Sequence, residues 1–218
     1  MKKIIPVLML ALVAVFSSCD KDEINNTETN VGRSDVTVYP ILTLNGEQYM
    51  TVPLNGTFTD PGAVAKEGTT TIQYTTSGTV NTAAVGVYRI VYTAANKDGF
   101  TANAYRWVAV YSTDATAAGN DLSGNYARNT NASVAVWTKK APGVYTVFNP
   151  GGAPGTNVTV FVFNQTGLTI KIPPFVHTDG TTFTSSNEVY TLTPSPARYS
   201  MVILNPGYGT ALRTFIKQ

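Results

Sequence analysis

From residue 36 to its end, the chain consists of short runs of β-branched and aromatic residues that alternate with Gly, Pro, Asn and Asp. Runs of this kind favour strands, and the residues between them favour tight turns. No apolar stripe with the period of a helix persists over about eleven residues in this region. The pattern therefore predicts an all-β protein, folded as a sandwich or a barrel.

The first 18 residues have a different pattern. Two lysines after Met1 precede the apolar run Ile4–Phe16, and Ser17-Ser18 then leads to Cys19, the only cysteine of the chain. The apolar run is shorter than the roughly 20 residues that span a bilayer, and it follows positive charges as in a secretory signal. We therefore predict that residues 1–18 are a cleaved signal peptide.

The Ser17-Ser18-Cys19 segment resembles the lipobox of bacterial lipoproteins, although Phe16 stands where that family more often has Leu. The resemblance implies that Cys19 is acylated and becomes the mature N-terminus, which attaches the protein to a membrane. Each buried methylene contributes about 0.8 kcal/mol, so several acyl chains hold firmly. The acidic cluster Asp20–Glu23 resembles a signal for transfer to the cell surface. The expected location is the outer membrane, exposed on the cell surface, with a periplasm-facing anchor as the alternative.

Composition shifts divide the mature chain into four segments. Residues 19–35 are polar and acidic and predict a flexible tether. Residues 36–112 and 121–218 each carry a series of strand patterns and predict two β-domains. Residues 113–120 are small and polar, which indicates a linker between them.

Residues 41–111 resemble the bacterial Ig-like repeat of cell-surface proteins and some crystal toxins. The likeness is carried by Leu44-Asn45-Gly46, Asp60-Pro61-Gly62-Ala63, Ser77-Gly78-Thr79-Val80, Gly86-Val87-Tyr88, Tyr92-Thr93-Ala94, and Arg106 with Val108 and Val110. It implies an Ig-like β-sandwich for residues 36–112. Relatives often have an Asp-rich loop where this chain has Ala65–Gly68, so we do not expect calcium there.

Residues 121–218 resemble the C-terminal domain of small lipoproteins encoded beside Sus-type glycan-uptake systems. The opening Leu122–Tyr126 and the hairpin segment Gly143–Val147 carry this likeness. Short turns with Gly or Pro predict consecutive antiparallel pairing, as a meander closed into a barrel or folded as a sandwich.

Strand patterns are assigned to the following residues. In the first domain they are Val36–Leu44, Tyr49–Pro53, Thr70–Thr75, Val87–Ala94 and Asn103–Tyr111, with shorter ones near Phe58 and Val80. In the second they are Leu122–Tyr126, Ala132–Thr138, Val144–Phe148, Val158–Phe163, Leu168–Ile172, Val189–Thr193, Tyr199–Leu204 and Ala211–Ile216.

Charge and chemistry exclude several functions. Without Lys2 and Lys3 the 13 remaining basic residues balance the 13 acidic ones, so we expect no nucleic-acid partner. One His and one Cys are too few for a structural zinc site, and we expect no metal and no cofactor.

Catalysis is also not expected. After the linker, the second domain has only the acids Asp121, Asp179 and Glu188, and His177 and Asp179 fit a polar turn. No nucleophile elbow or phosphate-binding glycine loop is present. We therefore expect no catalytic residues and interpret the protein as a non-enzyme.

Aromatic rings are the main candidates for ligand binding, because they stack on the apolar faces of sugars. Most rings of the second domain fit a core. Four lie in loops or at a strand end, where burial is not enforced. They are Trp137, Phe148, Phe175 and Tyr208.

The last strand of the first domain carries a second aromatic set. Tyr105, Trp107 and Tyr111 share one face of the strand, and Arg106, Val108 and Val110 share the other. The aromatic stripe is therefore either an interdomain contact or a ligand surface, unless both faces of the sheet are buried.

Together these features predict a non-catalytic, lipid-anchored cell-surface protein that binds a polysaccharide or oligosaccharide, or that serves outer-membrane glycan-uptake proteins. The alternative is a structural or adhesive Ig-like spacer that binds a protein partner and no glycan.

Overall fold

The computed structural model describes residues 30–31 and 34–218, and the chain divides into two compact units, residues 1–38 and 39–218. In the first unit, β1 (Asn30–Val31) pairs antiparallel with β2 (Ser34–Asp35). Cys19 and the predicted signal peptide lie outside the described residues, so the acylation of Cys19 stays a prediction. No helix within the described residues is long and apolar enough to cross a membrane.

The second unit begins with two sheets that form an Ig-like β-sandwich. One contains β3 (Pro40–Leu44), β5 (Ala63–Glu67) and β6 (Thr70–Ile72), all antiparallel. The other has the order β4 (Tyr49–Pro53), β9 (Thr101–Tyr111), β8 (Gly86–Ala95) and β7 (Tyr74–Ser77), with β4 parallel to β9. Residues from both sheets, including Leu42, Ala63, Ile90 and Val108, pack into one core.

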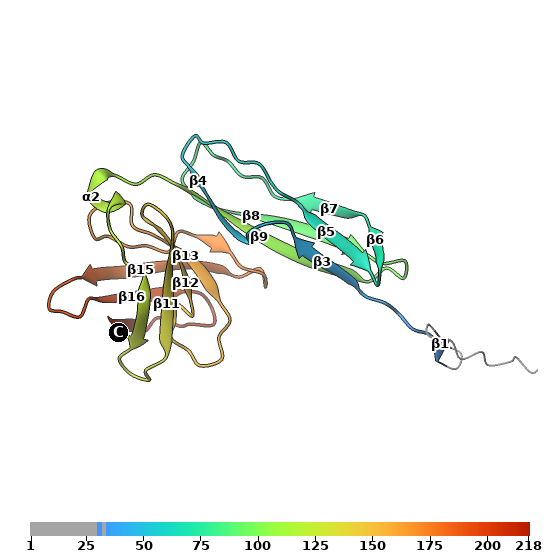
Figure 1. Ribbon diagram of the computed structural model, residues 1–218. Coiled ribbons are helices and arrows are strands. Elements are labelled where there is room, and N and C mark those ends of the chain that lie inside the picture. The colour runs from blue at the N-terminus through green and yellow to red at the C-terminus, as the bar shows by residue number, and fades with distance from the viewer. Residues whose placement is uncertain (1–29, 32–33) are drawn as a thin grey trace, which may run out of the picture. The chain divides into compact units, whose positions relative to one another are not determined.

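The hairpin of β8 and β9 is the longest pairing in the sandwich (Figure 1). Both strands are rich in β-branched and aromatic residues, which favour a pleated sheet. Asn96 closes the turn because its side-chain oxygen accepts the backbone N–H groups of Asp98 and Phe100. Gly99 has φ +85°, a conformation that suits glycine.

A buried arginine fixes the sandwich interior. Arg106 forms an ion pair with Asp60, and its guanidinium donates to the Tyr92 hydroxyl at 2.8 Å and to the Asn45 carbonyl at 2.5 Å. The Tyr92 hydroxyl also donates to Asp60 at 2.5 Å. Burial and this hydrogen bond raise the pKa of Tyr92. Asp60 begins a turn in which Pro61 fixes its own φ and Gly62 takes φ +75°, a conformation that suits glycine.

The second half of this unit forms one curled sheet of eight strands (Figure 1). The short helix α2 (Ala115–Ala118), which lies within the predicted linker, precedes it, and Asp114 caps that helix. The strands are β10 (Gly124–Arg128), β11 (Val134–Ala141), β12 (Val144–Phe148), β13 (Thr159–Phe163), β14 (Phe175–Val176), β15 (Thr182–Thr191), β16 (Arg198–Leu204) and β17 (Leu212–Lys217).

The spatial order of the sheet is β13-β12-β11-β10-β17-β16-β15-β14, with all pairs antiparallel. Two runs of consecutive pairing, β10 to β13 and β14 to β17, therefore meet where β10 pairs with β17. The strands form a single sheet, not the two packed sheets of a sandwich.

Aromatic rings fill the interior of the curled sheet. The Tyr199 ring stacks on Phe215 with centroids 4.8 Å apart and meets Trp137 edge-on at 5.0 Å. The Tyr126 hydroxyl donates to the Leu122 carbonyl at 2.7 Å and lies 2.9 Å from the Tyr190 hydroxyl. Alternation along each strand directs these bulky residues inward.

The predicted strands differ from the observed ones at several places. Tyr49–Pro53 and Val144–Phe148 have the observed bounds. The strands expected near Phe58, near Val80 and over 168–172 are absent, since those segments are turns or extended loops apart from a bridge between Phe163 and Lys171. β5 was missed because it follows the Pro-Gly turn directly, and its short, partly charged sequence has a weak strand pattern.

Candidate functional site

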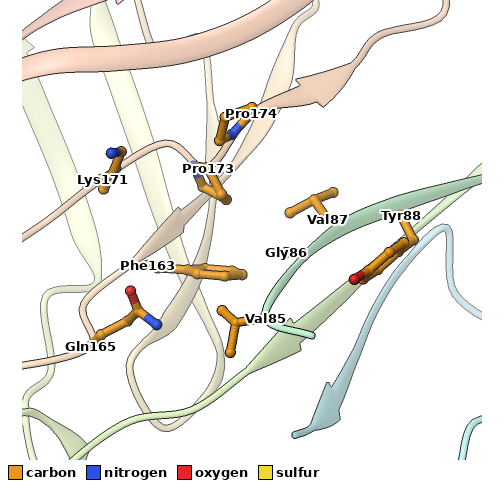
Figure 2. Close-up of a pocket in the computed structure, with 9 residues that line it drawn as sticks. All are labelled: Val85, Gly86, Val87, Tyr88, Phe163, Gln165, Lys171, Pro173 and Pro174. Atoms are coloured by element: carbon orange, nitrogen blue, oxygen red, sulfur yellow. The ribbon is translucent and has the colours of Figure 1, made fainter. Parts of the chain in front are cut away.

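A cavity of about 410 Å³ opens between the start of β8 and the segment that joins β13 to β14 (Figure 2). Its volume lies within the range of small-molecule sites, about 300–1,000 Å³. Its lining consists of Val85, Gly86, Val87, Tyr88, Phe163, Gln165, Lys171, Pro173 and Pro174. Segments far apart in the sequence thus build one hollow.

The wall from β8 is formed by a tyrosine that folds back along its own strand. The Tyr88 hydroxyl donates to the Ala84 carbonyl at 2.8 Å, which holds the ring beside Gly86. A Cβ at Gly86 would lie 3.7 Å from that ring, in ordinary contact. Because Gly86 has no side chain, this part of the ring remains uncovered on the cavity side.

The opposite wall depends on a buried asparagine. Asn164 is fully buried, and its side-chain amide donates to the carbonyls of Gly167 at 3.0 Å and Thr169 at 2.7 Å. These bonds fix the turn after β13. Phe163 and Lys171 then pair through two backbone hydrogen bonds of 2.8 and 2.9 Å. The turn therefore holds Gln165 and Lys171, both exposed, at the rim of the cavity.

The remaining wall is a stiff Pro173-Pro174 pair. Its backbone is held at Ile172, whose N–H donates to the Ser185 hydroxyl at 2.7 Å and whose carbonyl accepts from Thr184 at 3.1 Å. Proline fixes φ, so little entropy is lost when a ligand packs against this wall.

The lining combines apolar walls with a few polar groups at the rim. Val85, Val87, Phe163 and the prolines form the apolar part, as Figure 2 shows. The Gln165 amide can donate and accept, and the Lys171 ammonium can donate three hydrogen bonds. The cavity lining contains no carboxylate, so Lys171 has no acidic partner there. This arrangement suits a polyhydroxylated ring with one apolar face.

The aromatic stripe of β9 lies against the curled sheet. The Trp107 indole is 1% exposed, donates to the Val176 carbonyl at 3.0 Å and stacks on His177 with centroids 5.9 Å apart. Tyr105 and Tyr111 pack partly buried against the same core. These contacts favour the interdomain alternative over a ligand surface.

The opposite face of β9 is buried as well. Arg106, Val108 and Val110 are each 0% exposed. Both faces of this strand are therefore covered, the third possibility left open by its sequence.

Two of the four predicted ligand-binding aromatics are core residues. Trp137 is 2% exposed and packs between Tyr126, Tyr145 and Tyr199, while Phe175 is 4% exposed and stacks on Phe183. The expectation that these rings are available at the surface was wrong. β11 and β14 direct these side chains into the interior of the curled sheet. Their position at a strand end or in a loop of the predicted structure does not indicate this burial.

The other two have different surroundings. Phe148 is 43% exposed at the end of β12, opposite the exposed Val136 of β11. Tyr208 is partly buried, and the Arg213 guanidinium lies 5.3 Å from its ring centroid. A ligand-binding role for either ring stays a prediction. Neither lines the cavity.

Two further hollows lie on the Ig-like sandwich. A groove of about 550 Å³ has Phe58, Asp60 and several threonines in its lining, but the Asp60 carboxylate is engaged by Arg106 and Tyr92. A smaller one of about 290 Å³ lies over β3 and β5. No group of three or more metal-ligating side chains occurs in the part of the chain that the structure describes.

Sequence reasoning missed the cavity residues Tyr88, Gln165 and Lys171. Tyr88 lies inside the predicted strand Val87–Ala94, and Gln165 and Lys171 carry no motif. The Pro173-Pro174 pair is a sequence signal of a rigid loop in this region.

Comparisons with known proteins agree with the first domain. The model of the family described as bacterial surface protein, Ig-like domain, matches residues 42–110, which confirms the predicted Ig-like resemblance of that segment. No curated protein matches the chain. The crystal structure of a lipoprotein from Bacteroides thetaiotaomicron is similar to it, with 18% identity, a TM-score of 0.41, and coverage of 82% of this chain and 100% of that chain. A TM-score of this size carries no conclusion about function.

Proposed function

We propose that this protein is a non-catalytic accessory protein of the bacterial cell envelope that binds an oligosaccharide in the cavity between Tyr88 and Lys171. The supporting observation is the lining itself, which joins stiff apolar walls to amide and ammonium donors at the rim. A sugar ring stacks its C–H face on such walls while its hydroxyls bond to the donors. The lining has no pair of carboxylates of the kind that glycoside hydrolysis requires.

The location of the protein is part of this proposal. The match of residues 42–110 to a bacterial surface Ig-like family supports display on the cell envelope. The lipobox-like segment at Cys19 supports a lipid anchor in the outer membrane. The acidic cluster Asp20–Glu23 supports transfer to the cell surface, because it resembles a signal for that transfer. A role in glycan uptake is supported by the resemblance of residues 121–218 to the C-terminal domain of small lipoproteins encoded beside Sus-type glycan-uptake systems.

Affinity electrophoresis of the detergent-solubilised full chain against a panel of polysaccharides tests the binding. We expect at least one glycan to retard migration. Gln165→Ala and Lys171→Met should each weaken this binding about tenfold, the effect of losing one hydrogen bond worth about 1.4 kcal/mol. Gln73→Ala and Lys97→Met are matched controls, because both positions are exposed and lie outside all three hollows. No retardation by any glycan, with the fold intact, counts against the proposal.

Cell fractionation tests the anchor. Cys19→Ala should release the protein from the membrane fraction, because no thiol remains for acylation. Membrane association that persists in this variant contradicts the lipid anchor.

The exposed apolar residues of the Ig-like sandwich favour a second candidate function, docking of a protein partner. Ile41 is 65% exposed on β3, and Val64 on the neighbouring β5 is 38% exposed. Both line the 290 Å³ hollow. If the protein is a spacer or adhesin, Ile41→Glu should abolish partner binding, and no glycan should retard the wild type.

A further inference from the structure

Two arginines meet at one end of the interior of the curled sheet. Arg128 of β10 lies opposite Phe215 of β17, and Arg213 is two residues further along β17 on the same face. The turn after β12 lies against Arg128 and Phe215, since a Cβ added to Gly152 would be 2.8 Å from Arg128 Cδ and 2.8 Å from Phe215 Cε1.

Both guanidiniums bond only to neutral groups. Arg213 is 8% exposed, and its two terminal nitrogens donate to the carbonyls of Ala211, at 3.1 Å, and Tyr208. Arg128 donates through Nη1 to the carbonyls of Gly151 and Gly152, both at 3.3 Å. The Nε–H groups of both arginines are buried without an acceptor. Several strong donors are thus gathered in one place without a negative charge.

The acids of residues 113–218 do not supply that charge. Each of the four accepts a hydrogen bond from a nearby hydroxyl; the pairs are Asp114 with Thr116, Asp121 with Ser123, Asp179 with Thr181 and Glu188 with Ser185. Neither Arg128 nor Arg213 has an ion pair within the described residues. Burial, and then the charge of Arg128, lower the pKa of Arg213.

We propose that Arg128 and Arg213 form a binding site for an oxyanion, a carboxylate or a sulfate, either free or carried by a sugar. A guanidinium presents planar N–H groups that match these anions. Arg128 Nη2 makes no hydrogen bond within the described chain. Unlike Nε of the same residue, this nitrogen is not fully buried, so it is the donor that an anion reaches first. Two arginines close together also repel each other, and a bound anion removes that repulsion. The site shares no residue with the cavity of the proposed function and does not depend on it.

Thermal unfolding of the full chain in sodium sulfate, compared with sodium chloride at equal ionic strength, tests the site. Sulfate should raise the Tm of the wild type by about 3 °C, because a ligand of the folded state alone stabilises it. Arg128→Gln should lose most of this rise. Arg198→Gln is the matched control, since Arg198 also has a buried, unpaired Nε but lies on the outer face of β16. An equal rise in all three proteins is a general salt effect and overturns the proposal.

A second measurement needs no variant. Phenylglyoxal modifies arginine, and sulfate should slow the modification of Arg128 at least several-fold while leaving Arg198 unaffected. Equal protection of both positions, or of neither, overturns the proposal.

Affinity electrophoresis then distinguishes the source of the anion. Retardation by polygalacturonate that Arg128→Gln loses and Lys171→Met keeps assigns the site to an acidic glycan. A sulfate effect without retardation by polygalacturonate or a sulfated polysaccharide assigns the site to a free anion. Loss of neutral-glycan binding in Lys171→Met reports on the cavity alone, so the two proposals fail separately.

Discussion

The two halves of the unit formed by residues 39–218 each place an arginine inside a β-structure, and they treat its charge differently. In the Ig-like sandwich, Arg106 is 0% exposed and forms an ion pair with Asp60. In the curled sheet, Arg213 is almost as buried, but only backbone carbonyls accept its hydrogen bonds. The first arginine is neutralised by its own chain, and the second has no counter-charge within the described residues.

The charge of Arg106 therefore stabilises the fold, whereas the charge of Arg213 can still attract an anionic ligand. Besides its ion pair with Asp60, the Arg106 guanidinium donates to the Tyr92 hydroxyl and the Asn45 carbonyl. Its terminal N–H groups are therefore not available to a ligand. The core of the curled sheet otherwise consists of aromatic and aliphatic side chains, so two guanidiniums without a carboxylate are unusual there. Buried charge therefore identifies a candidate site only where the counter-charge is missing.

The largest expected effect is alkaline unfolding of the curled sheet. Burial raises the pKa values of four tyrosines of the curled sheet, Tyr126, Tyr145, Tyr190 and Tyr199. In the sandwich core, burial raises the pKa of Tyr92. A pKa raised on folding gives stability that is complete below the unfolded value of about 10 and is lost as the pH rises further.

Each such tyrosine removes about 1.4 kcal/mol per pH unit above that value, so the curled sheet should unfold before the sandwich. Trp137 fluorescence in a Trp107→Phe background, followed together with tyrosinate absorbance, measures this order. The interpretation fails if all tyrosines ionise while Trp137 remains in its folded environment.

The next largest effect is expected at the ion pair of the sandwich. Asp60→Ala leaves Arg106 buried without its carboxylate and should destabilise the protein by about 3 kcal/mol in urea unfolding. Asp98→Ala is the control, because the Lys97–Asp98 pair is largely exposed and should cost less than about 1 kcal/mol. Similar losses for the two variants would mean that the sandwich does not need its neutralising carboxylate.

A smaller loss is expected beside the unpaired arginines. A Cβ at Gly151 would lie 2.0 Å from Tyr208 Cε1, so Gly151→Ala must displace the ring that packs under Arg213. We expect a cost of about 2 kcal/mol, typical of overpacking. Gly119→Ala meets no atom within 4 Å and should be nearly neutral. If the unfolding curves of the two variants coincide, the Tyr208 ring can move aside at no cost, which contradicts this prediction.

The smallest effect distinguishes two core tyrosines. Tyr126→Phe removes a hydroxyl bonded to Leu122 and Tyr190 and should cost about 1 kcal/mol. The Tyr199 hydroxyl faces Trp137 but makes no hydrogen bond of good geometry, so Tyr199→Phe should be close to neutral. Equal costs in chemical unfolding would indicate that Tyr199 does have a partner.

Much of the fold follows from local sequence. The Asp60-Pro61-Gly62 turn and the strands Tyr49–Pro53 and Val144–Phe148 depend on backbone preferences of neighbouring residues, which act over a few positions. The all-β class follows from the same preferences.

The candidate sites depend on contacts that local sequence does not specify. Gln165 and Lys171 acquire a role only because Asn164 and Phe163 bring them toward β8, nearly eighty residues earlier in the chain.

By itself, the sequence determined that this chain folds into two successive β-structures, because strand and turn preferences are local, and its motifs in residues 41–111 resemble an Ig-like repeat. Tertiary structure alone decided that Trp137 and Phe175 are core, that the Trp107 stripe is an interdomain contact, and that Arg128 and Arg213 stand together without an acid. The physical reason is that burial and charge pairing depend on which strands become neighbours. In this chain that choice is made by the pairing of β10 with β17 and by the packing of β9 on the curled sheet.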